Sequence, residues 1–305
     1  AEHVCLSECR HDVPDHEVVR ACCGCELHST EVELYISQNS GDDERHIRCT
    51  VIDLPPALAA ECPCPAHVPF LRKKVAERRP PFVQEAVLDA GVKIIFPVIR
   101  GMDNTVESDE WKAYRTRKLH ELYEQYAELD VHADPVLEGF NILHDDTGVK
   151  RRKNIPASEN LIKLLKKGQG EMFYINTAVD IYNLLSLESK LALGAHNIDK
   201  VDGNVTLRFT DGTERFVPLG QTEPVPVAPH EYCYCDDSNE VLCRLEIRQV
   251  NKTAVDETAK NVFYIVQGNK ATPDELLWDT ARKLIADTEK YCGGSGEIVV
   301  PKVLT

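Results

Sequence analysis

The spacing of apolar residues changes partway along this 305-residue chain, and that change restricts the fold more than any other feature. From Trp111 to Leu129, apolar residues fall on one stripe of an amphipathic helix of about 22 residues. Val205, Leu207 and Phe209 instead alternate with polar residues, which is the period of a half-buried strand. Helices come first, strands follow, and a final helix completes the pattern. This order predicts an α+β domain with a largely antiparallel sheet.

Local signals set the limits of the first elements. An apolar run over 92–99 predicts a buried strand before the long helix. A second helix is expected to end near Thr147, and a third, ENLIKLLKK, to end at Gly168 through a glycine C-cap. Asn176 is a favourable N-cap for a further helix over 177–188.

Turn residues divide the later part of the chain into strands. Asp211 and Gly212 stand between two alternating runs and predict a hairpin over 204–219. A single sheet is expected to contain this hairpin and three more strands, over 231–235, 240–248 and 261–266. Buried, inert thiols are expected at Cys233, Cys235 and Cys243. The run Thr-Pro-Asp-Glu from Thr272 predicts a capping box for the last helix, which should end at Gly293 and Gly294.

The charge balance limits the classes of partner. With 35 Lys and Arg against 50 Asp and Glu, the formal net charge is −15. That charge opposes tight binding to phosphate backbones, so DNA is not an expected partner and any RNA contact should be local. No run of about 18 apolar residues is present, and no membrane span is expected. A steep salt dependence would require a local basic face, for which the candidates are Lys150 to Lys153 with Lys163, Lys166 and Lys167.

Eight of the twelve cysteines lie in the first 64 residues. Cys5-x3-Cys9 followed by Cys22-x2-Cys25 supplies two short-spaced pairs, which is what a tetrahedral structural zinc site needs. Further potential ligands are His11, His16, Cys23 and His28. Free or regulatory thiols and disulfides stay open as alternatives. Residues 1–81 are therefore interpreted as a Cys- and His-rich extension with a proline-rich linker, a possible zinc module and a possible docking site for a protein partner.

A series of motifs in the second half of the chain occurs in the order of a known family. It reads NTAVDIYN, LGAHNIDKVDGN, LRFTDGTERFVPLG, VLCR and RQV, followed by KTAVDETAKNV. The series resembles the B3/B4 domain, the amino-acid-editing module of the phenylalanyl-tRNA synthetase β subunit, and is more similar to free-standing B3/B4 proteins. The resemblance covers about residues 82–294, including a helical lead-in, and leaves 295–305 as a C-terminal tail. It implies a B3/B4 fold and a cytoplasmic location.

The resemblance also implies a pocket between the two halves of the domain that admits the aminoacyl end of a mischarged tRNA. A water would be positioned there mainly by backbone and polar side chains, and no catalytic triad or organic cofactor is expected. The implied catalytic residues are Asn183 and Glu257. The implied substrate-binding residues are Gly194, Ala195, His196, Asn197 and Thr258. Many synthetase β subunits have a histidine where this chain has Gly194.

Several polar residues have a second interpretation. Asp180 and Asn183 share one face of a helix, which by itself favours solvent, whereas the resemblance places Asn183 in the pocket. A lone histidine such as His196 is more often structural than functional. Arg244 and Arg248 lie on one predicted strand and could clamp a carboxylate or a terminal phosphate, or form a surface charge ladder.

The leading interpretation is a stand-alone B3/B4 protein that hydrolyses mischarged aminoacyl-tRNA in trans, with the 3′ aminoacyl end of tRNA as its partner. The alternative is a non-catalytic RNA- or amino-acid-binding protein that keeps the pocket. The acidic net charge and the glycine at position 194 favour this alternative. A third interpretation is a fragment or relative of a synthetase β subunit.

Overall fold

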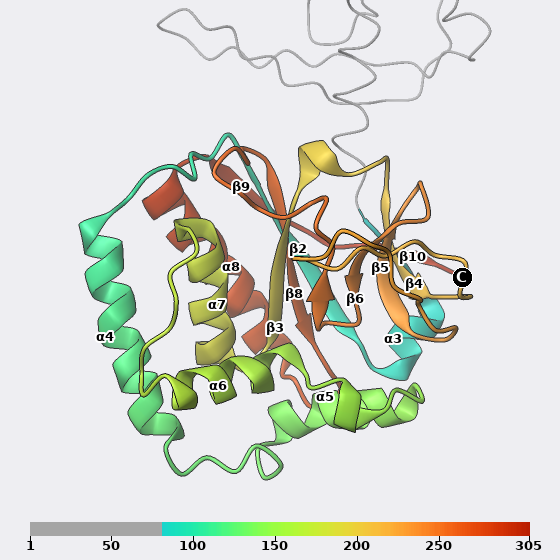
Figure 1. The fold of residues 1–305 in the computed structure, drawn as a ribbon, viewed down its shortest axis with the longest axis horizontal. Coiled ribbons are helices and arrows are strands. Elements are labelled where there is room, and N and C mark those ends of the chain that lie inside the picture. The colour runs from blue at the N-terminus through green and yellow to red at the C-terminus, as the bar shows by residue number, and fades with distance from the viewer. Residues whose placement is uncertain (1–80) are drawn as a thin grey trace, which may run out of the picture. The chain divides into compact units, whose positions relative to one another are not determined.

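The computed structural model of this protein describes residues 81–305, which belong to a unit running from Arg79 to Thr305. Helices and strands are both abundant in this part of the chain, which confirms the α+β class (Figure 1). The helices are α3 (Glu85–Ala90), α4 (Asp109–Tyr126), α5 (Pro135–Asp146), α6 (Ala157–Lys167), α7 (Thr177–Ser189) and α8 (Asp274–Cys292), with 3-10 turns η1 (Arg151–Lys153) and η2 (Ile198–Lys200). The strands are β1 (Phe82–Gln84), β2 (Lys93–Arg100), β3 (Ala192–Asn197), β4 (Val205–Phe209), β5 (Tyr232–Asp236), β6 (Val241–Arg244), β7 (Arg248–Gln249), β8 (Val262–Gly268), β9 (Ser295–Val299) and β10 (Lys302–Leu304).

A four-stranded antiparallel sheet in the order β3-β8-β2-β9 forms the middle layer. Both of its faces are buried, because β2 directs Ile95 and Ile99 into one core and Ile94 and Phe96 into another. This double burial explains why β2 and β8 are nearly continuous apolar runs and do not alternate. The strand predicted over 92–99 is β2.

Helices α4, α6, α7 and α8 lie on one side of this sheet (Figure 1). Their core includes Trp111, Tyr126, Leu185 and Leu284. The second sheet packs on the other side, together with α3 and α5, in the order β10-β1-β4-β5-β6-β7. Strand β1 is parallel to both β10 and β4, and the remaining pairs are antiparallel. The two cores therefore share the four-stranded sheet as a common wall.

The predicted helix limits are largely confirmed. Helix α4 is shorter than predicted and begins after Ser108, whose Oγ accepts a hydrogen bond from the Trp111 N–H at 3.1 Å. Asn176 caps α7 in the predicted way, with its side-chain oxygen 3.0 Å from the Val179 nitrogen. Helix α5 ends at Asp146, just before Thr147, and α6 ends at Lys167, just before Gly168. Gly168 has a φ of −81°, so it does not form the expected left-handed glycine cap. These ends depend on residues close in sequence, which is why the sequence alone predicts them.

The predicted hairpin over 204–219 is wrong. Strand β4 pairs with β1 and β5, and residues 213–219 make only isolated bridges. The Asp211-Gly212 turn instead forms around Glu214, whose carboxylate accepts hydrogen bonds from both turn N–H groups and pairs with Arg208 at 2.6 Å. A buried carboxylate thus holds the turn, and the chain after it leaves the sheet.

The expectation of one shared sheet is also wrong. Strand β8, predicted to join β4, lies in the middle sheet between β3 and β2. The segment 240–248 is not one strand, because Leu245 has a positive φ of 53° and turns the chain between β6 and β7. The sheet that β8 joins depends on partners far apart in sequence, whereas β7 pairs with β6 only four to six residues away.

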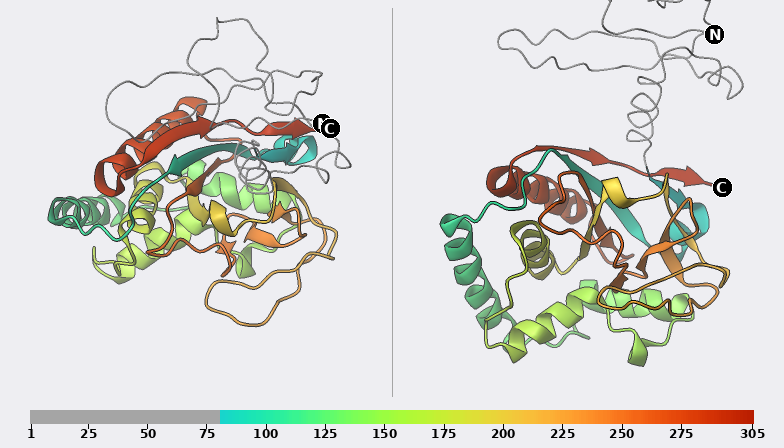
Figure 2. Two further views of the ribbon diagram at one scale, coloured as in Figure 1. Left: turned by 90° about the horizontal axis from the view of Figure 1, so that it is seen from above. Right: turned by 45° about the horizontal axis from the view of Figure 1, so that its top comes forward.

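The end of the chain differs from its prediction as well. Thr272 does not cap α8: its Oγ1 accepts a hydrogen bond from the Asn269 N–H, and α8 begins after Pro273 without a side-chain cap. The helix ends before Gly293 and Gly294, as predicted, and both have positive φ. Residues 295–305, expected to be a tail, form β9 and β10. Figure 2 shows these strands running beside β2 and β1, with which they pair.

Candidate functional site

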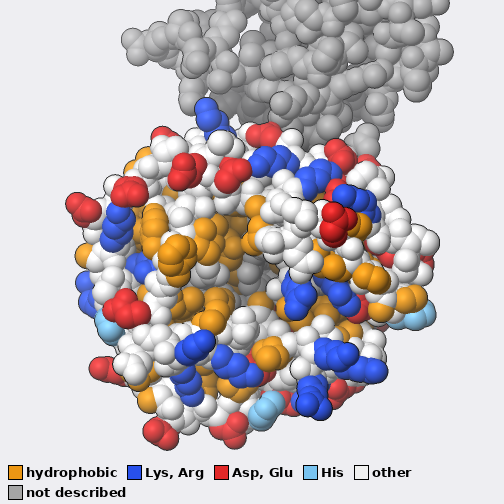
Figure 3. Space-filling model, in the orientation of Figure 1, with side chains coloured by type: hydrophobic (Ala, Val, Ile, Leu, Met, Phe, Trp, Pro, Cys, Tyr) orange, Lys and Arg blue, Asp and Glu red, His pale blue; other side chains and the backbone are white. Residues whose placement is uncertain are grey.

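One face of the domain is hollowed at its centre, in front of the region where Figure 1 shows α7 and β3 (Figure 3). Apolar side chains line much of the rim, and Lys and Arg side chains gather below it, over α6 and the connection from α5. Most Asp and Glu side chains of this view lie near its outer edge. The hollow is the natural place to look for a ligand site, because binding sites are concave and mostly apolar with a few polar groups.

The β3 residue Gly194 is in close contact with a side chain from the second sheet. A Cβ atom at this position would clash with Nε2 of Gln249 on β7. Burial raises the pKa of Tyr182 on α7, and a hydrogen bond with the Gln249 side chain opposes that shift. Gln249 therefore bridges the helical half and the strand half of the domain. Glycine at position 194 makes room for this bridge.

The predicted substrate-binding residues on the rest of β3 are buried. Ala195 is 1 % exposed and packs in the helical core. His196 is fully buried, stacks on Phe263 with ring centroids 5.1 Å apart, and places Nδ1 2.7 Å from Oγ1 of Thr253. Burial lowers the pKa of His196 to about 3, so the ring is neutral and a weak base. Its Nε2 has no hydrogen-bond partner among residues 81–305. Asn197 accepts a hydrogen bond from the Asp199 N–H and shapes the turn into η2.

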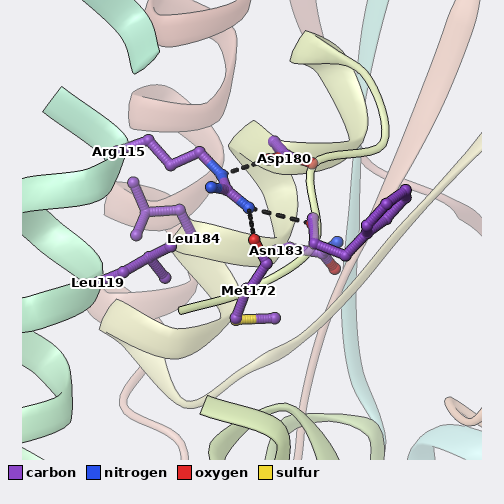
Figure 4. A pocket seen from close by; sticks show the side chains of 7 residues that line it. Arg115, Leu119, Met172, Asp180, Asn183 and Leu184 are labelled. Atoms are coloured by element: carbon purple, nitrogen blue, oxygen red, sulfur yellow. Dashed lines mark hydrogen bonds and ion pairs between the residues drawn. The ribbon is translucent and has the colours of Figure 1, made fainter. Parts of the chain in front are cut away.

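Asn183 faces a separate small cavity between α4 and α7 (Figure 4). Beside it, the Arg115 guanidinium pairs with the buried carboxylate of Asp180. The cavity measures about 10 Å³, which is room for about one water molecule. Its lining consists of Arg115, Leu119, Met172, Phe173, Asp180, Asn183 and Leu184. Asp180 is thus not solvent-facing, contrary to the pattern of the isolated helix, and Asn183 is half-buried.

The predicted residues Glu257 and Thr258 lie on an exposed loop. The Asp256 carboxylate organises this loop by accepting hydrogen bonds from Thr258 and Lys200, and those bonds lower the pKa of Asp256 to about 2. The loop reaches the start of α7, where Asn176 donates to the Val255 carbonyl at 3.0 Å. Asn183 lies two turns further along α7, a rise of about 10 Å. Glu257 and Asn183 therefore do not meet at one site in this conformation.

The two predicted arginines face each other across β6 and β7. Arg244 is already engaged in a two-pronged contact with Glu231, with both nitrogen–oxygen distances at 2.6 Å. Arg248 is exposed and makes no side-chain hydrogen bond or ion pair among residues 81–305. Of the pair, only Arg248 is available to an incoming anion. The sequence could not show this, because Glu231 is distant from Arg244 along the chain.

Gln249 is the residue that sequence reasoning missed. It belongs to the RQV motif, in which the preceding residue, Arg248, is the one whose charge suggests anion binding. The signal that points to Gln249 is the glycine at position 194, since a glycine within a strand often marks close approach by another group. Only the pairing of β7 beside β6 shows which group approaches.

The proposed zinc ligands Cys5, Cys9, Cys22 and Cys25 lie outside the described residues. Within residues 81–305, no cluster of His, Cys, Asp and Glu side chains is arranged to hold a metal ion. Cys233, Cys235 and Cys243 are buried free thiols, as predicted, and burial raises the pKa of Cys235 to about 12. No helix in the described part of the chain has the length and apolar character needed to cross a bilayer.

Comparison with known families assigns most of residues 81–305 to one domain family. The family model of the B3/4 domain matches residues 147–289. The chain contains a B3/4 domain. The match includes α6, α7 and strands β3 to β8, and therefore both Gly194 and Gln249. No curated protein matches the chain.

Among solved structures, the chain is similar to an N-terminal fragment of the phenylalanyl-tRNA synthetase β subunit from Pyrococcus horikoshii. The two share 14% sequence identity with a TM-score of 0.39. The similarity covers 74% of this chain and 52% of that fragment, so this chain spans about half of the fragment's length.

Proposed function

We propose that this protein hydrolyses the ester bond of mischarged aminoacyl-tRNA in trans. The observation that carries the proposal is the B3/4 domain match over residues 147–289. Editing of this kind removes a wrong amino acid from the 3′ end of tRNA, and a hollow next to β3 suits an aminoacyl group.

Hydrolysis of this ester does not require an ionised side chain as nucleophile. A water must attack the ester carbonyl while donors stabilise the oxyanion that develops. Strand β3 lies at the edge of its sheet, so the backbone groups on its outer side have no neighbouring strand. Gly194 has no side chain on the sheet face where the Gln249 amide lies, and that amide can both donate and accept hydrogen bonds. We place the reacting ester here, with Gln249 as its positioning residue and Asn183 as a more distant support.

One observation favours a non-catalytic binding protein instead. Glu257 is exposed and makes no side-chain hydrogen bond or ion pair among residues 81–305, and Asn183 faces a separate cavity. Neither implied catalytic residue is therefore held in place beside Gly194. A protein that binds an aminoacyl end or a free amino acid without hydrolysis would need only the hollow.

A deacylation screen with a panel of mischarged tRNAs tests the proposal. Wild-type protein should release the amino acid from at least one of them. Gln249→Ala should lower the rate by about 10²-fold, since it removes one orienting group. Asn183→Ala should lower the rate by about 10²-fold or less, because Asn183 faces a separate cavity. Gln125→Ala, an exposed amide on α4, is the matched control and should keep the wild-type rate. No turnover by wild type on any substrate, with binding lost in Gln249→Ala, would establish the non-catalytic alternative.

A further inference from the structure

Residues 150–167 have a charge opposite to that of the whole chain. This stretch contains seven Lys and Arg residues and one acidic residue, Glu159, whereas the complete chain carries −15. It comprises η1, the following connection and α6. Figure 3 shows Lys and Arg side chains gathered in this area, directly below the hollow. A local excess of this size in an acidic protein calls for a specific explanation.

Three of the seven cations are used within the fold. Arg151 pairs with Glu138 at 2.7 Å and Asp145 at 2.5 Å. Lys163 pairs with Glu159 at 2.5 Å. Lys166 donates to the Leu129 carbonyl at 3.2 Å. These three contacts hold the stretch in place.

The other four cations are exposed and have no ion pair or side-chain hydrogen bond among residues 81–305; they are Lys150, Arg152, Lys153 and Lys167. We call these four residues the basic cluster. A position at the C-terminal end of α6 favours a cation through the helix dipole, which accounts for Lys167 alone. The three cations around η1 have no such explanation. Unpaired cations repel one another, and a polyanion would remove that repulsion.

The hollow beside the basic cluster indicates which polyanion. A substrate whose acyl end enters the hollow must place its adjoining phosphates near the rim, and Lys and Arg side chains gather below the hollow, over α6 and the connection from α5 (Figure 3). A bilayer surface fits less well. It would require several apolar side chains projecting with the cations, but within residues 150–167 only Ile155 and Leu164 are exposed large apolar residues, while Ile162 and Leu165 are buried.

We infer that the basic cluster binds the phosphodiester backbone of the RNA whose 3′ end enters the hollow. This inference rests on the proposed function. It assigns a separate surface to RNA affinity, outside the β3 site where the ester would react. It also explains how a protein with a net charge of −15 could bind RNA, because phosphate contacts depend on local cations.

The test measures binding of uncharged tRNA by fluorescence anisotropy across a KCl series. Uncharged tRNA has no ester, so the readout does not depend on hydrolysis. The variant is Arg152→Gln/Lys153→Gln, and the matched control is Arg282→Gln/Lys302→Gln, which removes the same charge from exposed positions on α8 and β10. The cluster variant should bind more weakly, and its slope of log K against log salt should be smaller by about 1.4–1.8, or about 0.7–0.9 per lost phosphate contact. The control should keep the wild-type slope.

Equal slopes for the cluster variant and wild type would overturn the inference, as would no tRNA binding by wild type. Vesicles of phosphatidylcholine and phosphatidylserine serve as a second probe. The wild-type protein could bind these vesicles and the cluster variant could fail to bind them, with no change in the salt slope for tRNA. That result would show that the basic cluster binds membranes instead of RNA. The cluster variant could show the expected smaller salt slope while the wild-type protein deacylates no tRNA. That result would refute the proposed hydrolysis and still support RNA binding by the basic cluster.

Discussion

Two buried ion pairs hold helices to the rest of this domain, and they differ in the cation that each uses. On the helical side, Arg115 of α4 pairs with Asp180 of α7. On the strand side, His144 of α5 pairs with Glu246 in the turn between β6 and β7, with Nε2 and Oε1 2.8 Å apart. Arginine stays charged at every accessible pH, whereas histidine titrates near neutrality. The stability of the two sides should therefore respond differently to pH, although each side contains a buried charge pair.

The Arg115 pair fixes geometry more than it adds stability. Arg115 also donates to the carbonyls of Met172 and Phe173, at 3.0 and 3.1 Å, and Asp180 accepts from the Ile175 N–H at 3.1 Å. Burial raises the pKa of Asp180, and the Ile175 N–H and Arg115 only partly oppose that rise. The carboxylate is therefore incompletely compensated for its loss of water. Its contacts instead set the path of the segment that leads into α7 beside the Asn183 cavity.

The His144 pair is part of a buried cluster with Tyr232, whose hydroxyl donates to the Glu246 carboxylate. Burial alone would lower the pKa of His144, but the neighbouring Glu246 carboxylate raises that pKa by more than burial lowers it. The net effect is a raised pKa. His144 is thus charged over a wider pH range in the folded protein than in the unfolded chain. The contact joins α5 to the second sheet next to β7, which carries Gln249.

The largest expected effect comes from breaking the helical-side pair. Asp180→Asn should lower the free energy of unfolding by about 3–5 kcal/mol, because it leaves the Arg115 charge buried without its partner. Arg115→Leu/Asp180→Leu should cost less than the single change, since no charge then remains. Urea unfolding followed by tryptophan fluorescence measures this region specifically, because both tryptophans, Trp111 and Trp278, lie within residues 81–305. A double variant as unstable as the sum of its single variants would contradict this account.

The strand-side pair should make stability depend on pH. Because the folded-state pKa of His144 is raised above 6.5, its contribution is fully present below pH 6.5 and is lost as pH rises through the folded pKa. Each unit of that pKa difference corresponds to about 1.4 kcal/mol. Unfolding measured from acidic to alkaline pH should show wild type losing this stability, while Glu246→Gln, which removes the charge partner, should lose less. Asp180→Asn is the control and should keep the wild-type slope over the same range. Identical slopes for wild type and Glu246→Gln would rule out the histidine as the cause.

The smallest expected effect lies at the contact that bridges the two sides. Gly194→Ala should lower the free energy of unfolding by about 1 kcal/mol, the lower end for overpacking, because the end of the Gln249 side chain can move. Gln249→Ala in the same chain should remove the clash and restore much of the loss. Thermal unfolding of the two single variants and the double variant measures this coupling. A Gly194→Ala cost that is unchanged by Gln249→Ala would show that another group fills the space beside position 194.

Much of the fold could be predicted from local signals. The caps of α4, α5, α6 and α7 depend on neighbouring residues, and so does the end of α8. The motif series indicated the B3/4 domain because it combines many such local features in one order. The candidate site was predicted less well. Asn183, Gly194 and Arg244 were chosen by motif, yet their surroundings depend on Arg115, Gln249 and Glu231, which are remote in sequence.

The sequence alone predicts the family, the α+β class, and the positions of the helices and most strands, because each of these follows from residue types at short spacing. The tertiary structure adds which sheet each strand joins, the burial of Asp180 and His196, and the pairing of Arg244. It also shows that the four cations of the basic cluster have no ion pair among residues 81–305. Those outcomes depend on which segments meet across long stretches of chain. A residue's charge state and availability are set by its neighbours in space, and a single sequence does not name them.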